Sequence, residues 1–326
     1  MSHAVAGATS VRVWLVVGVS AFTLLLAGCA SVFPPAQTAA LRATRPADLE
    51  VRAEQVDVPF FPQTPYHCGP AALATVLPSA GFDSTPEQLA QAVFLPSREG
   101  TLQTEMLSGA RRVGALALRL PPQLTDVLRE VQRGTPVIVL QNLGLSFAPR
   151  WHYAVVVGYD LPGDEVVLRS GTTKREVLSL ATFEYTWARG GRWAMVVMRP
   201  GQLPATVLEA DAVQAAVGFE RVTLPTQAAM VYDSVLQRWP DSRVAAIGLG
   251  NALQAAGDLD GAARAFEGAA QRHGDAVAWN NLATVLLAQG RREAAQQAAR
   301  RAVESAQASE PHWLPQALDT LASTRR

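Results

Sequence analysis

The sequence predicts an α+β domain over residues 51–200, followed by an all-α repeat domain over residues 209–326. Three observations predict this order. Helical patterns come first in the earlier region, Val-rich and aromatic strand patterns come second, and the last third repeats itself. The chain has 326 residues and 49% hydrophobic residues, enough for two cores.

The helices of the first domain are indicated by apolar spacing and by capping signals. Cys68 to Ser79 is apolar at helical spacing, with Gly69-Pro70 in its first turn. Thr85-Pro86-Glu87-Gln88 reads as a capping box with proline at the first helical position. Two further helices are expected over Thr104–Val113 and Pro122–Arg133, the second ended by Gly134.

The strands of the first domain follow these helices. We expect them at Pro136–Gln141, His152–Asp160, Glu165–Arg169, Lys174–Leu180 and Arg192–Arg199. Leu161-Pro162-Gly163-Asp164 forms the turn of a hairpin. Helices followed by an antiparallel sheet are typical of an α+β domain.

The N-terminus has the pattern of an export signal. Arg12 precedes an apolar run that ends in Leu26-Ala27-Gly28-Cys29. This pattern resembles a bacterial lipoprotein signal, which implies removal of residues 1–28, lipidation of Cys29 and a tether over residues 29–50. An uncleaved anchor is the alternative, but a membrane span needs about 20 apolar residues. Ala30, rather than Asp, then implies an outer-membrane lipoprotein that faces the periplasm.

Two cysteines occur in the chain, and lipidation would use the first. Cys68 is then the one thiol left in an oxidising compartment, without a partner in its own chain. The Gly-Pro that follows it and the polar residues that precede it are unlike a buried core. A reactive thiol is therefore the better interpretation of Cys68.

Two motifs carry the chemistry of a thiol nucleophile. Cys68 opens a helix, where the dipole and unpaired N–H groups favour a thiolate, and Gln63 lies one short loop before it. His152 opens a strand later in the chain and is placed as a general base. A glutamine amide can serve as an oxyanion donor. His67, beside the cysteine, is expected only to line the wall of the cleft.

The run from Gln63 through Cys68 and the strand that follows His152 resemble the bacteriocin-processing (double-glycine leader) cysteine peptidases and their papain-like relatives, over about Val56 to Met198. The resemblance implies a papain-like domain with a Cys68/His152 thiolate–imidazolium pair and Gln63 as oxyanion donor. These relatives orient the histidine with an Asp followed by Pro. This chain has Leu168-Arg169-Ser170-Gly171 there.

The third catalytic residue is therefore open on sequence grounds. Ser170 can accept a hydrogen bond from imidazole, although it offers no charge to an imidazolium. Asp160 and Asp164, on or near the hairpin turn, are the other candidates. We predict Ser170 as the residue that orients His152.

The C-terminal region repeats with a helical-hairpin period. Ala245 to Gly257 aligns with Ala278 to Gly290, and Ala262 aligns with Ala295. Both units resemble tetratricopeptide repeats, with Trp279, Leu282 and Ala295 at family positions. An earlier degenerate unit shares this pattern through its apolar residues, Phe219, Ala228, Tyr232 and Val235, and Pro240. A plain helical bundle is the alternative. Stacked units form a concave surface that binds peptides or partner proteins.

The sequence thus predicts a periplasmic lipoprotein with a cysteine peptidase domain, a peptide or protein substrate, and a protein partner held by the repeats. The formal net charge of zero argues against nucleic acid as a partner. No phosphate loop, nucleotide fingerprint or metal motif is present, so no cofactor is expected. A catalytically weak peptide-binding module and an NlpC-type peptidoglycan amidase are the alternative functions.

Overall fold

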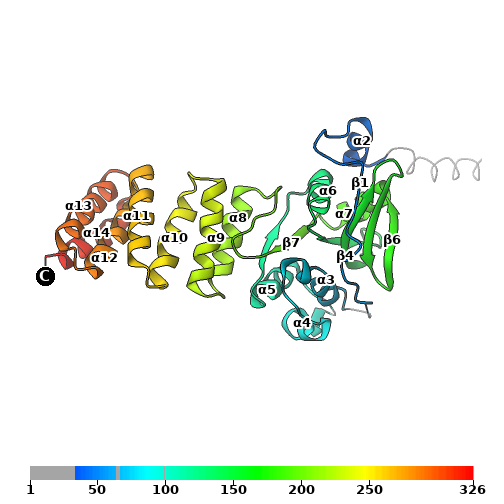
Figure 1. Cartoon of the computed structure of the whole chain (residues 1–326), viewed down its shortest axis with the longest axis horizontal. Helices are drawn as coiled ribbons and strands as arrows, with labels where there is room; N and C mark the ends of the chain where they lie inside the picture. Colours follow the sequence, from blue (N-terminus) through cyan, green and yellow to red (C-terminus); the bar gives the residue numbers. More distant parts are fainter. Residues whose placement is uncertain (1–33, 64–66, 99, 326) are drawn as a thin grey trace, which may run out of the picture.

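The computed structural model describes residues 34–63, 67–98 and 100–325. The molecule is elongated, with a sheet domain at one end and a stack of helices at the other (Figure 1). The predicted signal and Cys29 lie outside the described residues. Among the described residues, no helix combines the length and apolar character that a membrane crossing requires.

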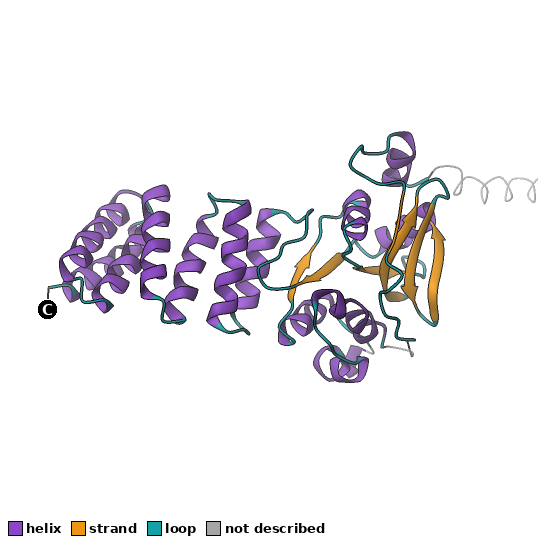
Figure 2. Cartoon of the chain, viewed as in Figure 1, coloured by secondary structure: helices purple, strands orange, loops and turns teal. Residues whose placement is uncertain are grey.

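The sheet domain is built on one antiparallel sheet, with strand order β2-β7-β3-β4-β5-β6 and β1 paired to the end of β4 (Figure 2). The strands are β1 (Arg52–Glu54), β2 (Leu116–Arg119), β3 (Val137–Asn142), β4 (Trp151–Asp160), β5 (Glu165–Ser170), β6 (Thr173–Ser179) and β7 (Ala194–Met198). The register pairs Gln141 of β3 with His152 of β4. This pairing places His152 at the start of a central strand.

Both faces of the sheet are buried, and successive residues of a strand alternate between them. Val137 and Val139 pack into one core, whereas Ile138 and Leu140 pack into the other. The second core contains α3 (Cys68–Val76), the short 3₁₀ helix η2 (Leu77–Ala80), α4 (Pro86–Val93) and α5 (Gln103–Arg112). The first core contains α2 (Ala36–Ala43), α6 (Leu124–Gln132) and α7 (Leu180–Arg189). A further 3₁₀ turn, η3 (Pro96–Arg98), follows α4.

Most of the predicted elements are present within a residue or two. The capping box at Thr85 forms as predicted, because its hydroxyl accepts from Gln88 N at 3.3 Å and its N–H donates to Gln88 Oε1 at 3.0 Å. The sequence interpretation missed α7 and β2. The start of α7 does carry a signal, since Ser179 caps it by accepting from Thr182 N at 3.1 Å.

The expected tether over residues 29–50 is wrong for its described part. Residues 36–43 form α2, in which Thr38 and Leu41 are buried. The reason is Glu184 of α7, a fully buried carboxylate that accepts from Gln37 N at 3.1 Å and from Thr38 N at 2.6 Å. These N–H groups belong to the first turn of α2 and have no partner within the helix. The carboxylate therefore fixes α2 to the domain.

The C-terminal helices form successive antiparallel hairpins, each packed on the next (Figure 2). They are α8 (Glu209–Glu220), α9 (Pro225–Arg238), α10 (Arg243–Ala255), α11 (Leu259–His273), α12 (Ala276–Ala288), α13 (Arg292–Ser309), the 3₁₀ turn η4 (Pro311–Trp313) and α14 (Leu314–Ser323). The aligned Gly257 and Gly290 follow α10 and α12 with φ of 83° and 76°, a conformation that glycine adopts without strain. The predicted helical repeat region is confirmed.

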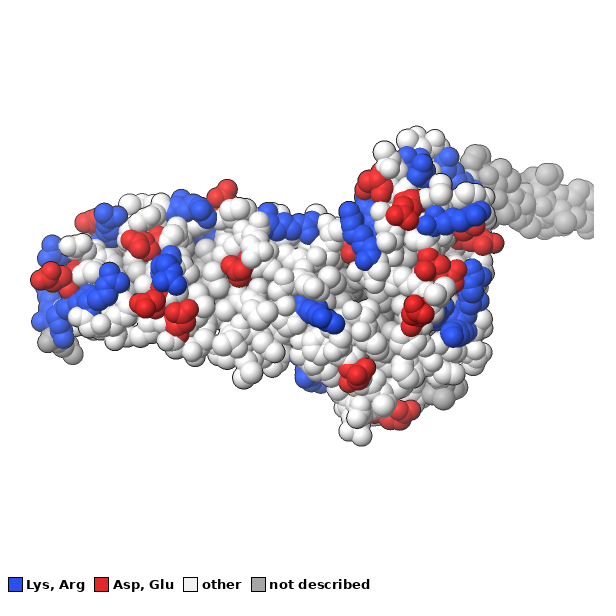
Figure 3. Space-filling model, viewed as in Figure 1, with Lys and Arg blue, Asp and Glu red and all other residues white. Residues whose placement is uncertain are grey.

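The sheet domain and the first repeat helices share a core. Ala215 and Phe219 of α8 are buried in the same cluster as Leu116 and Leu118 of β2, the edge strand. Helix α8 therefore covers this edge and joins the two regions. Acidic and basic groups are interspersed over both ends of the face shown in Figure 3, as the zero net charge suggests.

Candidate active site

Cys68, His152 and Gln63 line one cavity of about 1180 Å³ on the sheet domain. Cys68 is the first residue of α3, and His152 is the second residue of β4. The backbone of Tyr153, the residue after His152, hydrogen-bonds to the Cys68 thiol. The structure thus brings together the three residues that the sequence analysis placed in one site.

His152 contacts Ser170, the predicted orienting residue. His152 Nε2 lies 2.9 Å from Ser170 Oγ, and the serine is buried at the end of β5. Strand pairing explains the contact, because β5 runs antiparallel to β4 and returns to its start.

Asp160 and Asp164 do not contact His152. Asp160 ends β4, about 26 Å from His152 at roughly 3.3 Å per residue, and Asp164 lies in the turn that follows β4. Asp160 pairs with Arg52 at 2.8 Å, and Asp164 pairs with Arg42 at 2.5 Å. Among the described residues that the sequence analysis considered, Ser170 is therefore the one in contact with the histidine.

Gln63 is fixed by the same turn that carries Ser170. Gln63 Oε1 accepts from Gly171 N at 3.2 Å, and Gln63 N donates to Gly171 O at 2.9 Å. Gln63 Nε2 donates to the carbonyl of Tyr153 at 3.3 Å, which leaves its second hydrogen for another acceptor. Gly171 makes the turn after β5 with φ of 56°. One turn thus holds both the base and the amide donor.

Electrostatics in the cleft differ from the expected ion pair. Burial raises the pKa of the Cys68 thiol, and hydrogen bonds from the backbone of Tyr153 and Gly69 oppose this only in part. The direction is opposite to the one that a helix N-terminus predicts. Burial also lowers the pKa of His152, against the attraction of the Glu176 carboxylate. Both shifts favour the neutral thiol and the neutral imidazole.

Several residues of the cleft were not foreseen. Thr101 fills space beside Gly69, where an added Cβ would lie 2.7 Å from the Thr101 side chain. Tyr153 donates its hydroxyl to the carbonyl of Thr101 at 3.1 Å. Glu176, on β6, is the carboxylate that acts on His152. The sequence held no signal for Thr101 or Glu176, because pairing of distant segments brings them here.

His67 does not have the expected place in the cleft wall. Its ring stacks on Phe94, with ring centroids 4.9 Å apart. It is absent from the residues that line the cavity. This contact ties the start of α3 to the end of α4.

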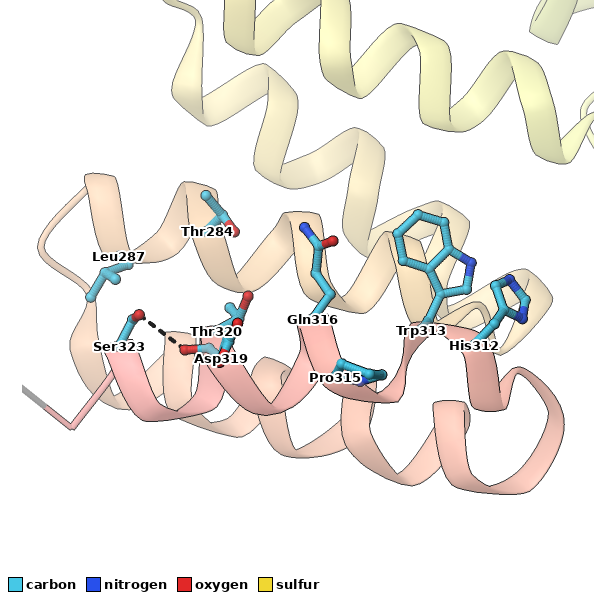
Figure 4. Close-up of a pocket in the computed structure, with 9 residues that line it drawn as sticks. All are labelled: Thr284, Leu287, His312, Trp313, Pro315, Gln316, Asp319, Thr320 and Ser323. Carbon is cyan, nitrogen blue, oxygen red and sulfur yellow. Dashed lines mark hydrogen bonds between the residues drawn. The ribbon is translucent and has the colours of Figure 1, made fainter.

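A separate cavity of about 730 Å³ lies between α12 and α14 in the repeat region (Figure 4). His312 and Ser323 occupy opposite ends of it, as Figure 4 shows. Ser323 donates its hydroxyl hydrogen to the backbone carbonyl of Asp319 at 3.0 Å, and the ring of His312 lies 5.6 Å from that of Trp313. This cavity does not pair a nucleophile with a base. The described residues contain no cluster of three or more His, Cys, Asp or Glu side chains that could hold a metal ion.

The sheet domain matches a known protein family. Residues 55–195 match the Peptidase_C39 like family, which confirms the resemblance predicted from the sequence. No curated protein matches the chain.

Solved structures resemble the two regions separately. A C39-like peptidase from Bacillus anthracis is 19% identical, with 46% of this chain and 98% of that chain covered and a TM-score of 0.39. The peptidase domain of Streptococcus ComA is 18% identical, with 44% and 98% covered and a TM-score of 0.36. The Sgt2 TPR domain from Aspergillus fumigatus is 17% identical, with 36% and 77% covered and a TM-score of 0.33.

Proposed function

We propose that this chain, whose residues 55–195 match the Peptidase_C39 like family, is a cysteine peptidase that cleaves a peptide or protein. One observation carries the proposal. A helix-opening cysteine, a histidine with a hydrogen-bonded orienting residue, and a fixed glutamine amide line the same cavity. These are the nucleophile, base and oxyanion donor that acyl transfer requires.

The mechanism that we propose uses one tautomer of His152, in which Nε2 donates to Ser170. If Nε2 carries a hydrogen and donates it to Ser170 Oγ, Nδ1 is unprotonated and can accept the proton of the Cys68 thiol. The sulfur then attacks the carbonyl carbon of the substrate. His152 passes the proton to the leaving amine, and water, deprotonated by His152, hydrolyses the thioester.

Charge on the carbonyl oxygen develops during this attack. The free hydrogen of Gln63 Nε2 and the backbone N–H of Cys68 are the donors that we assign to it. Three hydrogen bonds, two with Gly171 and one with the carbonyl of Tyr153, hold Gln63 in place. Its amide therefore needs no reorganisation when negative charge develops on the carbonyl oxygen of the substrate.

The resting state supports proton transfer during attack rather than a preformed ion pair. Burial raises the pKa of Cys68 and lowers that of His152, and Ser170 supplies no charge to an imidazolium. The thiolate–imidazolium pair expected from the sequence would then form only as the substrate binds. The same features favour the alternative function, a cleft that captures a peptide but cleaves it weakly.

The test of the proposed function is turnover of quenched fluorescent peptide pools by the full chain. Cys68→Ala and His152→Ala should both abolish hydrolysis, whereas His312→Ala, a histidine in the repeats, should leave it unchanged. Intact mass after treatment with a peptidyl chloromethyl ketone should show one adduct, on Cys68. Peptide binding without turnover or adduct would replace the peptidase with the peptide-binding alternative.

We also propose that the repeats hold a protein partner or the substrate. The support is a polar contact between equivalent helices of two successive repeats. Asn281 of α12 donates to Asn251 Oδ1 of α10 at 3.3 Å, and both side chains are on the surface that these two helices share. A photo-crosslinking residue at Asn251 should capture a polypeptide in cells, and one at the exposed Arg300 of α13 serves as the control. Equal capture at both positions would refute this role of the surface.

Finally, we propose that the chain is a lipoprotein anchored through Cys29 and facing the periplasm. The support is the Leu26-Ala27-Gly28-Cys29 sequence, and α2 begins only seven residues later. Wild type should stay with membranes in high salt, which removes proteins held by charge, and Cys29→Ser should not be lipidated. An unmodified Cys29 with an intact leader in mass spectrometry would refute the anchor.

A further inference from the structure

We propose that the catalytic cleft continues into a basic groove between the sheet domain and α8, and that this groove binds an acidic stretch of the polypeptide substrate. The inference rests on the proposed peptidase function only in naming the ligand as the substrate. The groove itself is defined by its lining and its charge.

A second cavity, of about 640 Å³, adjoins the catalytic one. Residues of α5, β2 and α8 line it. Gln103, Gly190 and Gly191 line both cavities, so the two meet at the turn between α7 and β7. A peptide that occupies both cavities would reach from Cys68 to α8, the first repeat helix.

Arginine dominates the charge of the combined cavity. Six arginines line its two parts, namely Arg98, Arg150 and Arg189 around the cleft and Arg111, Arg119 and Arg221 beyond the turn. Among the described residues that line the two cavities, Asp211 is the one acidic residue. This local excess contrasts with the zero net charge of the whole chain.

These arginines lack carboxylate partners in the part of the chain that the structure describes. None of the six forms an ion pair with another described residue. Elsewhere on the same domain, Arg42, Arg52, Arg129 and Arg175 each pair with an Asp or Glu. Among the described residues, the six guanidinium groups that line the two cavities therefore have no carboxylate to neutralise them.

Arg111 is the clearest case of an arginine in this groove whose hydrogen-bond donors lack acceptors in the described part of the chain. Its Nε is buried and has no hydrogen-bond partner among the described residues, and Nη2 reaches only the carbonyl of Ala117 at 3.5 Å. Gly218 of α8 makes room for it, since an added Cβ would lie 2.4 Å from Arg111 Nη1. Burial also lowers the pKa of Arg111. A ligand carboxylate would supply an acceptor to the part of the Arg111 guanidinium that lines the cavity.

A peptide is the ligand that suits both parts of this groove. The cleft holds groups suited to attack on an amide bond, and the arginines beyond it suit carboxylates, which they bind with paired hydrogen bonds. Glutamate and aspartate side chains on one side of the cleaved bond meet both requirements. The acidic stretch then lies against α8, which gives the first repeat helix a part in substrate recognition.

Binding to the full-length Cys68→Ala variant tests the groove without turnover. The probe is a fluorescein-labelled peptide of Gly and Ser with four consecutive glutamates, compared with the same peptide carrying four glutamines. We expect the glutamate peptide to bind about tenfold more tightly at about 20 mM salt. The difference should shrink to less than about twofold at about 500 mM salt, because the Debye length falls.

Two matched double variants locate the effect. Arg119→Gln with Arg221→Gln removes two exposed cations from the groove and should weaken glutamate-peptide binding about fivefold. Arg112→Gln with Arg133→Gln removes the same charge from exposed positions outside both cavities and should change binding by less than about twofold. An equal loss of glutamate-peptide binding in both double variants would refute the proposed binding role of the groove.

The outcomes separate this inference from the proposed function. Equal binding of the glutamate and glutamine peptides refutes the groove, even if wild type hydrolyses neutral peptides. Arginine-dependent preference for glutamate supports the groove, even if no peptide is hydrolysed and the peptidase proposal fails. Tighter, arginine-dependent binding of a labelled single-stranded oligonucleotide would overturn the assignment to a peptide.

Discussion

His152 Nε2 and Ser170 Oγ lie 2.9 Å apart, at the point where β5 returns to the start of β4. The next residue, Gly171, binds both the backbone and the side chain of Gln63. A single turn therefore positions the base and the oxyanion donor. The resemblance to the double-glycine leader peptidases implies a carboxylate at the position where this chain has the Ser170 hydroxyl.

Ser170→Ala should lower the acylation rate by up to about tenfold, which corresponds to one neutral hydrogen bond of about 0.5–1.5 kcal/mol. Ser170→Asp should maintain or raise the rate, because a carboxylate stabilises the imidazolium that forms. Pre-steady-state acylation or Cys68 labelling measures both. Asp160→Asn and Asp164→Asn are matched controls, and a larger loss in either of them than in Ser170→Ala would contradict the assignment.

Cys68 should alkylate slowly at neutral pH. Burial raises the pKa of its thiol, so the reactive thiolate is scarcer at pH 7 than in an ordinary thiol with pKa about 8.5. The iodoacetamide rate should climb through pH values above about 8.5. Mass spectrometry over a pH series gives this profile, with free cysteine as reference. A rate plateau that begins below pH 7 would instead show a preformed thiolate–imidazolium pair.

His152 should titrate below the ordinary histidine pKa of about 6.5, because burial disfavours its charged form. Hydrolysis that requires neutral imidazole should therefore fall only as the pH drops through this lowered pKa. Glu176→Gln should move the pKa lower still, since the carboxylate raises it.

NMR titration of the His152 ring measures this pKa without any substrate. Glu165→Gln, on the neighbouring strand β5, is the control, because Glu165 does not appear among the charges that act on His152. An upward shift in Glu176→Gln would contradict the geometry of the cleft.

Glu184→Ala should release α2 from the domain. The buried carboxylate accepts three hydrogen bonds from Gln37 N, Thr38 N and Thr38 Oγ1, and alanine would leave these donors without partners. We expect a loss of about 2–4 kcal/mol in the free energy of unfolding. Hydrogen exchange should rise first over residues 36–43. Exchange there equal to wild type would show that apolar contacts alone hold α2.

Local patterns determined much of this protein. The capping box at Thr85, the Cys68 helix start and the His152 strand are short-range features, and residues near them in sequence specify each one. The repeat period follows from self-similarity between Ala245–Gly257 and Ala278–Gly290. The sequence also identified Gln63, Cys68, His152 and Ser170 as candidates because their motifs are local.

Tertiary structure alone decided what depends on pairing and burial. Strand register brought Ser170 rather than Asp160 to His152, and burial set the directions of the Cys68 and His152 pKa shifts. Docking on Glu184 turned part of an expected tether into a helix. Hydrogen bonds, desolvation and contacts between distant segments have no periodic signature in a sequence, and they appear only when the chain is folded.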